Sequence, residues 1–552
     1  MNWKIKHKQN KPQNQNGLIN FFLKSRKITQ RKNFLKPSPI TLKNLIKNTK
    51  ISILQLEKAL TLINKSIKEE RPIIIYGDYD VDGICATAIL WQALYPLHKK
   101  TLPFIPDRFK HGYGLNEKGL KEALKLFENQ KPLIITVDNG ITAAKIINKY
   151  KKKGIDFIVT DHHQIPKDKP HASAIIHSDL VCGATVSALL SQAIHSSDGD
   201  PDEIRSSSDG VNAADLVALA TICDQMPLIG INRNLVIEGL KEINKKTNIG
   251  LKSLIESSGI DGKLTVYHLG FILGPRLNAA GRLKDPLIAL RLLCTPNIKQ
   301  ASELSKQLSD LNANRQKLTT DSIDIALKEI EKLKKTPSII SIYHSFFHEG
   351  IIGLIAGKLT NRFNRPSIAL SPQGEYFKAS ARSVENFNII SFLRKKQELF
   401  EELGGHPAAA GFVIKKENLA KLKKFLKTVK IKINPNPALD IDLLLSENQN
   451  LGELNRAISL LSPFGQGWEE PILALQNIEV ISHRYVGKDQ NHLQLKLKIQ
   501  DQPISAISFN HPKGFDYKNI NIAFNLNENI YQGKTSIQLI IKDIKAGSSG
   551  II

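Results

Sequence analysis

Three carboxylates follow a short apolar run near residue 75. After Ile73 the chain reads Ile-Ile-Tyr-Gly-Asp78-Tyr-Asp80-Val-Asp82. In an extended segment, a spacing of two places alternate side chains on one side. Three like charges repel each other unless something cationic lies among them, so the motif indicates a cation site. The alternative is a surface turn, because Asp and Gly are common turn residues.

Two further apolar runs end in the same kinds of side chain. Leu133–Val137 is followed by Asp138, and a second Ile/Val-containing run is followed by Asp161, His162 and His163. Ligands of open α/β sheets bind at the carboxyl ends of the strands. Three strand ends with acids and imidazoles therefore favour one shared site over three separate turns.

Asp224 is a fourth candidate. It separates two apolar stretches, Leu216–Cys223 and Met226–Ile229. An unpaired charge in such surroundings is costly to desolvate, and a metal ion would offset that cost. The alternative is a partly exposed Asp at the end of a helix.

The ligand types narrow the choice of metal. Carboxylates with one or two imidazoles and no thiolate suit Mg²⁺ or Mn²⁺ better than structural zinc, and a histidine ligand favours Mn²⁺. More acids than one ion needs indicate a binuclear site with a bridging carboxylate. Two ions about 3.5–4 Å apart are the usual arrangement for hydrolysing phosphoesters.

The elements around these residues predict an α/β fold with a parallel sheet. Short Ile/Val-rich runs, including Phe157–Thr160 and Ala174–Ile176, alternate with helical patterns such as Gly83–Leu94 and Ile141–Lys152. This alternation is typical of βαβ units around a buried sheet. The Ser/Asp/Gly stretch 196–210 is expected to be an exposed loop.

The second half of the chain predicts three further parts. Leucines recur at helical spacing in 300–335, which indicates a long connecting helix. A second α/β region follows, with a strand at Ile339–Tyr343 and a helix near Ile351–Phe363. After residues 434–437, five strand-like runs indicate a small β-barrel; they are Ile478–Ser482, Leu493–Ile499, Ile504–Phe509, Ile520–Phe524 and Ser536–Ile541.

We therefore expect five regions. They are a basic N-terminal arm and helix (1–70, with the helix at Leu54–Ile67), a catalytic domain (71–299), a connecting helix (300–336), a second α/β domain (337–432) and a barrel domain (433–552).

Composition agrees with a nucleic-acid partner. The chain has 552 residues, 77 Lys and Arg against 52 Asp and Glu, a net charge of +25, 41% apolar and 23% charged residues. These fractions exclude a mainly disordered chain. Nucleic acid is the favoured partner of such a basic chain, ahead of an anionic membrane surface or a merely solubilising charge.

Targeting and redox signals are few. No apolar run approaches the roughly 20 residues of a membrane helix. The first 50 residues contain no Asp or Glu, which fits a basic arm, or alternatively a transit peptide. The four cysteines, Cys85, Cys182, Cys223 and Cys294, form no CxxC pair, so a zinc ribbon or disulfide framework is not indicated and a reducing cytosol fits.

The motifs together resemble the DHH phosphoesterase superfamily, and within it the RecJ family of bacterial single-strand-specific 5′→3′ DNA exonucleases. The resemblance covers nearly all of residues 70–545. It is carried by the acidic motif at 77–83, Asp-His-His at 161–163, the segment 215–224, Gly-Pro-Arg-Leu-Asn-Ala-Ala-Gly-Arg at 274–282, His-Glu-Gly-Ile-Ile-Gly at 348–353, Gly-Gly-His-Pro-Ala-Ala-Ala-Gly at 404–411 and Pro-Phe-Gly-Gln-Gly at 463–467.

The resemblance implies a DHH domain, a DHHA1 domain, an OB-like barrel and specific residue roles. The implied ligands of two Mn²⁺ or Mg²⁺ ions are Asp80, Asp82, Asp138 (bridging), His162 and Asp224. Asp78 and Asp161 would orient these ligands, and His163 would lie near the scissile phosphate. The implied substrate contacts are Arg108, Arg276, Asn278, Arg282, Ser380, Arg382 and His406. An arginine suits phosphate because its planar fork bonds bidentately, although a single arginine is more often only a surface charge.

Some features depart from the family pattern or stay open. His177-Ser178 stands where the family usually has Asn-Pro, residues 181–187 differ from its Gly-Ala-Gly-Val pattern, and 196–210 is an uncommon insertion. In the barrel, Phe464, Trp468, Tyr485 and Phe509 are candidates for base stacking, or alternatively core residues.

The resulting expectation is a monomeric cytoplasmic exonuclease that releases 5′-mononucleotides and cooperates with a single-strand binding protein and a RecQ-type helicase. The main alternative is an oligoribonuclease or cyclic-dinucleotide phosphodiesterase of the same superfamily; such chains are usually shorter and lack the barrel. A decayed, non-catalytic helicase subunit would have lost ligands, and a family pyrophosphatase would lack the 404–411 motif.

Overall fold

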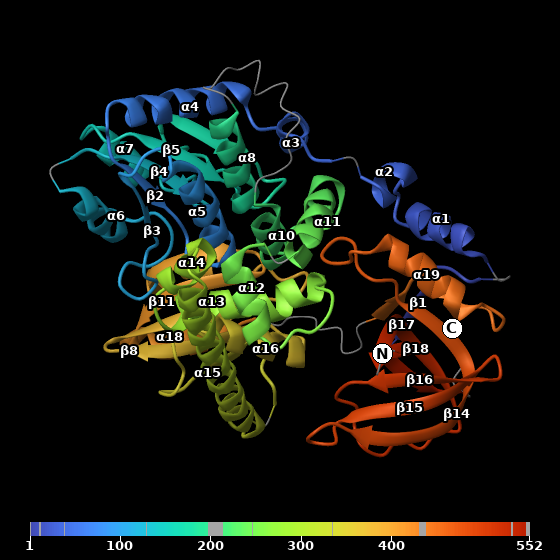
Figure 1. The fold of residues 1–552 in the computed structure, drawn as a ribbon. Coiled ribbons are helices and arrows are strands. Elements are labelled where there is room, and N and C mark those ends of the chain that lie inside the picture. The colour runs from blue at the N-terminus through green and yellow to red at the C-terminus, as the bar shows by residue number, and fades with distance from the viewer. Residues whose placement is uncertain are drawn as a thin grey trace. The chain divides into compact units, whose positions relative to one another are not determined.

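The structure is a computed structural model that describes residues 2–9, 13–37, 39–128, 130–196, 213–245, 247–333, 335–429, 438–531 and 534–547. It contains two compact units (Figure 1). One comprises residues 40–224 and 235–433, and the other comprises 1–39, 225–234 and 434–552. The expected loop 196–210 lies, apart from Ser196, outside the described residues. Among the described helices, none is long and apolar enough to cross a bilayer.

A five-stranded parallel sheet forms the first layer of the larger unit. Its order is β3-β2-β4-β5-β6, and all neighbouring strands are parallel. The strands are β2 (Ile73–Tyr76), β3 (Thr101–Phe104), β4 (Leu133–Val137), β5 (Phe157–Asp161) and β6 (Ala174–His177). Every residue of β2, β4 and β5 is buried, which explains their uninterrupted apolar runs. The predicted parallel sheet is confirmed.

Helices cover both faces of this sheet. Helices α5 (Val81–Leu94), α8 (Gly183–His195) and α10 (Ala214–Cys223) pack together on one face. Side chains of α6 (Glu117–Leu124) and α7 (Ala144–Lys151) share an apolar core with the other face. Helix α4 (Ile53–Lys68) contacts edge strand β6, and α3 (Leu42–Thr49) contacts α8.

A helical layer leads from this sheet to the second one. It contains α11 (Gly230–Lys245), α12 (Ile249–Ser257), the π-helix η3 (His268–Leu273), α13 (Gly274–Leu283), α14 (Leu287–Cys294) and the long α15 (Ile298–Glu331). Helices α12, α13 and α14 pack along α15, the helix predicted for 300–335.

The second sheet of the larger unit has the order β10-β11-β9-β8-β7. Its strands are β7 (Ile340–Tyr343), β8 (Ser367–Gln373), β9 (Tyr376–Arg382), β10 (Phe400–His406) and β11 (Ala409–Lys415). Helix α16 (Ile352–Phe363) packs on β8 and β9, and α17 (Ile389–Arg394) and α18 (Leu419–Leu426) contribute to the core. The predicted strand and helix of this region are both present.

The smaller unit contains a closed β-barrel. Strands β14, β15, β16, β18 and β17 follow one another, and β14 also pairs with β17, which closes the ring. Their bounds are β14 (Leu473–Val486), β15 (His492–Ile499), β16 (Gln502–Ser508), β17 (Asn519–Tyr531) and β18 (Lys534–Ala546). Each of the five predicted strand-like runs falls on one of these strands. Strand β13 (Leu443–Leu444) and helix α19 (Leu451–Leu461) precede them.

The first 70 residues contain more regular structure than the basic arm and single helix that we expected. Strand β1 (Asn2–Ile5) pairs with β12 (Ala438–Ile441), and helix α1 (Gln15–Ser25) packs on α19; a short α2 (Arg31–Leu35) follows. The reason is an apolar face that the charge count conceals: four residues of α1, Leu18, Ile19, Phe22 and Leu23, are buried. The one basic residue within α1, Lys24, is exposed.

Candidate active site

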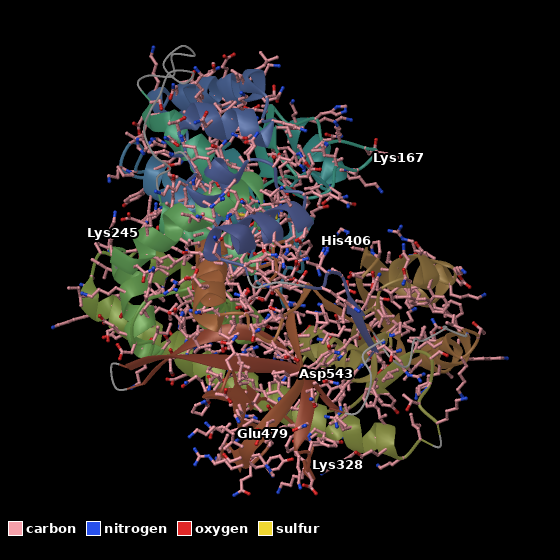
Figure 2. The ribbon with its side chains drawn as sticks, turned by 90° about the vertical axis from the view of Figure 1, so that its right-hand side faces the viewer. Lys167, Lys245, Lys328, His406, Glu479 and Asp543 are labelled. Atoms are coloured by element: carbon pink, nitrogen blue, oxygen red, sulfur yellow. The ribbon has the colours of Figure 1, made fainter. Side chains whose placement is uncertain are left out.

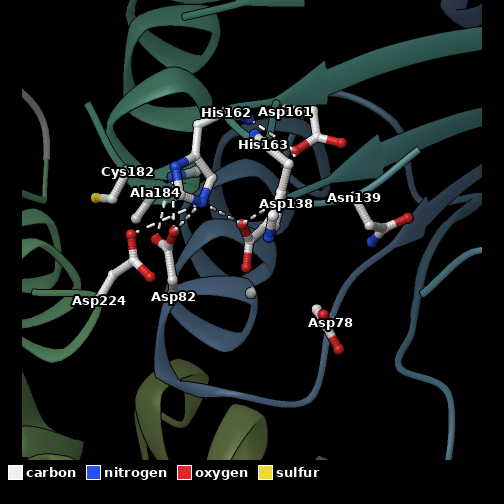
Figure 3. Close-up of polar contacts among 12 residues, drawn as sticks. Asp78, Asp82, Asp138, Asn139, Asp161, His162, His163, Cys182, Ala184 and Asp224 are labelled. Atoms are coloured by element: carbon white, nitrogen blue, oxygen red, sulfur yellow. Dashed lines mark hydrogen bonds and ion pairs between the residues drawn. The ribbon is translucent and has the colours of Figure 1, made fainter. Parts of the chain in front are cut away.

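The acidic motifs converge at one edge of the parallel sheet. Strands β2, β4 and β5 are direct neighbours, so the residues that follow them lie together (Figure 3). Asp138 follows β4 with a left-handed φ of 60°, which ends the strand sharply. Gly140 follows with a φ of 109°, and a Cβ there would lie 2.5 Å from the Thr136 hydroxyl. This turn places the Asp138 carboxylate beside the other acids.

His162 lies at the centre of the cluster. Its Nε2 atom is 3.2 Å from Asp138 Oδ1, 3.6 Å from Asp82 Oδ2 and 3.7 Å from Asp224 Oδ2. Two groups of side chains could each hold a cation: one is Asp138, His162 and His163, and the other is Asp82, His162 and Asp224. Burial lowers the pKa of His162, so its imidazole is neutral and can act as a ligand.

The N-terminus of α8 holds Asp82 in place. The backbone amides of Gly183 and Ala184 donate to the two carboxylate oxygens, at 2.6 and 2.7 Å. Only glycine fits at 183, because a Cβ there would lie 2.7 Å from the Cβ of Asp138. The segment 181–187, which departs from the family pattern, thus supplies the amides that orient Asp82.

Asp161 orients the histidine pair. Its Oδ1 accepts from the amides of His162 and His163 at 2.7 and 3.0 Å, and its Oδ2 accepts from Ile141 at 2.8 Å. Burial alone would raise the pKa of Asp161, but the hydrogen bond and charge of His163 lower it. Since Asp161 is ionised, His163 Nδ1–H is the donor in their 2.8 Å contact.

His163 keeps its proton at neutral pH. Burial would lower its pKa, but Asp161 and the charge of Asp78 raise it to about 9. Its Nε2 atom is 3.5 Å from the hydroxyl of Tyr113.

Asp78 and Asp80 occupy the loop between β2 and α5. Asp78 is buried, and its Oδ1 accepts from the Tyr79 amide at 2.7 Å. Asp80 caps α5 by accepting from the Gly83 amide at 3.0 Å, and it belongs to neither of the two groups around His162. Its role as a ligand stays a prediction.

The positive charge of His163 does not compensate all the carboxylates of the cluster. Burial, with the neighbouring carboxylates, raises the pKa of Asp138 well above its usual range, that of Asp78 to about 7 and that of Asp224 to about 8. Asp138 Oδ1 is buried with no hydrogen-bond partner. Among the described residues, no lysine or arginine forms an ion pair with these acids. The donor set therefore fits one or two divalent cations.

A second cluster consists of arginines without counter-ions. Burial, together with the charges of Arg108 and Arg315, lowers the pKa of Arg282 to about 10. Burial and Arg108 also lower the pKa of Arg382. None of these guanidiniums forms an ion pair with a described residue. Such a cluster is suited to a phosphate group.

Two glycines of the 348–353 motif leave room for Arg282 and Arg382, because a larger residue at either position would collide with them or crowd them. A Cβ on Gly350 would lie 1.9 Å from the Arg282 carbonyl oxygen, and one on Gly353 would lie 3.0 Å from Arg382 Nη2. Arg382 Nη1 donates to the Ser380 hydroxyl at 3.0 Å. The structure thus brings together residues from three distant parts of the sequence: Arg108, Arg282, and the neighbouring Ser380 and Arg382.

Comparisons with known proteins agree with this geometry. Three family models match: "DHH family, N-terminal domain" over residues 72–221, "DHHA1 domain" over 335–432 and "RecJ OB domain" over 441–543. The chain is 31% identical to the single-stranded-DNA-specific exonuclease RecJ of Escherichia coli, over 88% of this chain and 90% of that one. The chain belongs to the RecJ family.

Other RecJ proteins show the same similarity. The Bacillus subtilis RecJ is 31% identical over 88% of this chain, which spans 63% of that longer relative. The crystal structure of RecJ in complex with Mn²⁺ from Thermus thermophilus superposes with a TM-score of 0.80 and 28% identity, covering 96% of this chain and 76% of the other. The match to the RecJ OB domain supports RecJ over the smaller phosphodiesterases considered as the alternative.

Residues 177 and 178, where the resemblance led us to expect Asn-Pro, both make hydrogen bonds to neighbouring elements. His177 Nε2 lies 2.7 Å from the carbonyl oxygen of His163, and it is the donor because a carbonyl only accepts. The Ser178 hydroxyl donates to the Thr49 carbonyl at 2.7 Å. His177 thus holds the loop that carries His163, and Ser178 joins the end of β6 to the end of α3.

His406 lines a cavity together with residues of the first sheet. The cavity has a volume of about 530 Å³ and also includes His163, Asp161 and Tyr113. His406 is exposed at the end of β10 (Figure 2). The structure thus places His406 on the His163 side of the cluster.

Arg276 and Asn278 lie on α13. Arg276 Nη1 donates to the Ile272 carbonyl at 2.8 Å, and its Nε is buried without a partner. Burial is the larger cause that lowers the pKa of Arg315, and the positive charge of Arg276 lowers it further. The two guanidiniums therefore lie near each other. Asn278 is half-buried.

The predicted stacking aromatics of the barrel differ in exposure. Trp468 is buried and its indole donates to the Leu461 carbonyl at 3.0 Å, so it is a core residue, not a stacking residue. The Tyr485 hydroxyl donates to the Pro512 carbonyl at 2.6 Å. Phe464 is half-buried, and Phe509 is 54% exposed.

Sequence reasoning missed three residues of the site. Asn139 donates to the Tyr76 and Val137 carbonyls and so joins the ends of β2 and β4. Tyr113 and Arg315 are the other two. Asn139 directly follows a predicted ligand, whereas nothing in the helical pattern around Arg315 distinguishes it from a surface charge.

Proposed function

We propose that this chain hydrolyses single-stranded DNA from its 5′ end and releases 5′-mononucleotides, using two divalent ions, Mn²⁺ or Mg²⁺. The observation that carries the proposal is the buried acid–histidine cluster around His162, in the same unit as an arginine cluster without counter-ions. The family membership supplies single-stranded DNA as the substrate class.

The ligands of the ions are assigned from this geometry and the family motifs. Asp82, Asp138, His162 and Asp224 would hold them, with Asp138 as the bridge and Asp80 as a further ligand. When bound, the ions lower the pKa of a water molecule and stabilise the attacking and leaving oxygens. Asp82 is already oriented for this purpose by the amides of α8.

The remaining side chains would orient His163 and donate a hydrogen bond to the substrate. Asp161 keeps the His163 Nδ1 atom occupied, so the Nε2–H of the protonated ring is directed away from Asp161 and can donate to a phosphate oxygen. This arrangement favours the scissile phosphate, and not a metal ion, as the partner of His163. Asp78 supports the charge of His163.

The arginine cluster would hold the terminal 5′-phosphate. Arg108, Arg282 and Arg382 carry positive charges that repel each other until an anion binds among them. Binding energy from this remote contact positions the next phosphodiester at the acid cluster. Arg276, Asn278, Ser380 and His406 would contact the phosphates and sugars that follow.

Localisation and further partners belong to the same proposal. We place the reaction in the bacterial cytoplasm, where the DNA substrate is, and a helicase of the RecQ type and a single-strand binding protein would supply and protect the strand. Pull-down of each protein with the full chain tests these two partners.

The experiment that tests the function is a degradation assay with Mn²⁺ and labelled oligonucleotides. A 5′-labelled single strand should release labelled mononucleotide first, and a blunt duplex should resist. Release of a 3′ label before a 5′ label, or equal digestion of the duplex, would contradict the proposal and favour a small-oligonucleotide phosphodiesterase.

A further inference from the structure

Two stacked aromatic rings are exposed to solvent in the larger unit. The side chain of Tyr267 is 60% exposed and that of Phe271 is 72% exposed. Their ring centroids lie 5.2 Å apart, with an angle of 25° between the planes. Large apolar side chains that remain exposed side by side mark an interaction surface more often than isolated ones do.

The segment 267–273, which carries the two rings, has a buried side and a solvent-exposed side. Tyr267 precedes the π-helix η3, and Phe271 lies within it. Leu269 and Leu273 of the same element are completely buried. The apolar residues that the core requires are thus already inside, and the two rings are not part of the core.

Close contacts fix η3 against the end of α10. A Cβ on Gly270 would lie 3.2 Å from Ile222, and one on Gly274 would lie 2.3 Å from the sulfur of Cys223. The Cys223 thiol also donates to the Leu269 carbonyl oxygen at 3.7 Å. The next residue along the chain is Asp224, so the rings belong to an element that packs against the helix end immediately before this residue.

Asp224 is at the open edge of the acid cluster. Its side chain is 27% exposed, whereas those of Asp82 and Asp138 are 2% and 3% exposed. The cluster is therefore accessible from solvent at Asp224. The cavity with His406 lies on the other open side, where His163 is 28% exposed.

A cationic side chain accompanies the rings. Arg276 follows Phe271 by five residues, and its guanidinium donates to the Ile272 carbonyl oxygen of η3. Its Nε–H is buried with no partner, and Arg315 is close enough to repel it. An element that exposes two aromatic faces and also binds a guanidinium offers partners for both the π-face and the phosphate of an unpaired nucleotide.

We propose that Tyr267 and Phe271 form a stacking platform for an unpaired base of the strand held at the acid cluster. The inference rests on the proposed function, because it assumes that a nucleic-acid strand reaches that cluster. In a duplex the base faces are covered by neighbouring base pairs, so the platform favours single strands over duplexes.

The test is a binding measurement without divalent metal, so that no strand is cleaved. Phe271→Leu and Tyr267→Leu, alone and combined, keep apolar volume but remove the rings. The probes are fluorescent oligothymidylate and an abasic strand of the same length and charge. We expect the double variant to bind oligothymidylate about 5- to 150-fold more weakly, the range for the loss of one base–aromatic stack, and to bind the abasic strand like the wild type.

Two controls keep the result interpretable. Phe271→Trp keeps a ring and should retain tight binding, and Leu54→Ala removes a 58% exposed side chain of α4 and should have no effect. Unchanged binding of oligothymidylate by the double variant would overturn the proposal. An equal loss on the abasic strand would also overturn it, because it would show a disturbance of the phosphate contacts.

The failure of this inference is distinguishable from failure of the proposed function. Wild-type protein that degrades single strands with Mn²⁺ while the double variant binds normally would reject the platform alone. Wild-type protein that binds through the rings but cleaves nothing would reject the exonuclease proposal and keep the platform.

Discussion

The Nε2 atom of His162 lies 3.2 Å from Asp138 Oδ1, a buried oxygen with no hydrogen-bond partner. A neutral imidazole and an unsatisfied carboxylate at this distance, with Asp82 and Asp224 at 3.6 and 3.7 Å from the same Nε2 atom, are an arrangement that a cation would stabilise.

Asp138→Ala should lower the rate of strand hydrolysis more than about 100-fold, because replacing even an outer partner of a metal ligand costs about 10- to 100-fold. DNA binding should persist, since the arginine cluster is unchanged. The measurement is degradation of a 5′-labelled single strand after chelation and resupply of Mn²⁺. The control is Asp261→Ala, which removes an exposed carboxylate outside the site. Activity of Asp138→Ala within tenfold of the wild type would contradict the assignment.

The metal-free protein should lose stability as the pH rises from about 4 to about 9. In the folded state the pKa is about 7 for Asp78, about 8 for Asp224 and about 9 for His163, all above the usual values. The folded protein therefore holds protons that the unfolded chain releases, and the resulting stabilisation is lost as the pH rises through these folded-state pKa values. Urea unfolding in EDTA at several pH values measures this trend.

Saturating Mn²⁺ should weaken or reverse the loss of stability that the metal-free protein shows as the pH rises. The carboxylates must lose their protons before they bind a metal ion, so the affinity for Mn²⁺ rises with pH. Titration calorimetry at about pH 6 and about pH 8 tests this. Equal affinity at both pH values would mean that the raised pKa of Asp224 has no part in metal binding.

Arg382→Ala should impair digestion of 5′-phosphorylated strands much more than of 5′-hydroxyl strands. One lost charge-assisted contact costs about 1.5–3 kcal/mol, which is about 10- to 150-fold in kcat/KM. Arg394→Ala, which removes an exposed arginine of α17, is the matched control. Equal losses on both kinds of end would show that Arg382 does not bind the terminal phosphate.

Gly183→Ala should disrupt the acid cluster although it alters no ligand. The new Cβ would lie 2.7 Å from the Cβ of Asp138, so either the carboxylate or the start of α8 must move. We expect weaker Mn²⁺ binding and at least about tenfold lower activity. Gly17→Ala is the control, because its Cβ would make only ordinary contacts, at 3.4 Å or more. Normal metal affinity of Gly183→Ala would show that the cluster tolerates this displacement.

Local patterns in the sequence predicted much of the architecture. The strands β2, β4 and β5 are continuous apolar runs because both faces of the sheet are covered, and the barrel strands alternate because one face is solvated. The same rules missed the fold of the first 39 residues. There, the number of lysines and arginines hid an apolar helical face that packs on α19.

By itself, the sequence determined which residues could do chemistry: acids and histidines at strand ends, and a family-specific set of motifs. Only the tertiary structure decided which of them meet. Asp82 and Gly183 are 101 residues apart in sequence, yet the amide of one helix start orients the carboxylate of another. Arg108 and Arg382 are also far apart in sequence, yet they repel each other because folding brings their guanidiniums close together. The physical reason is that periodicity describes each segment's own faces, whereas electrostatics, burial and close contacts depend on neighbours that folding supplies.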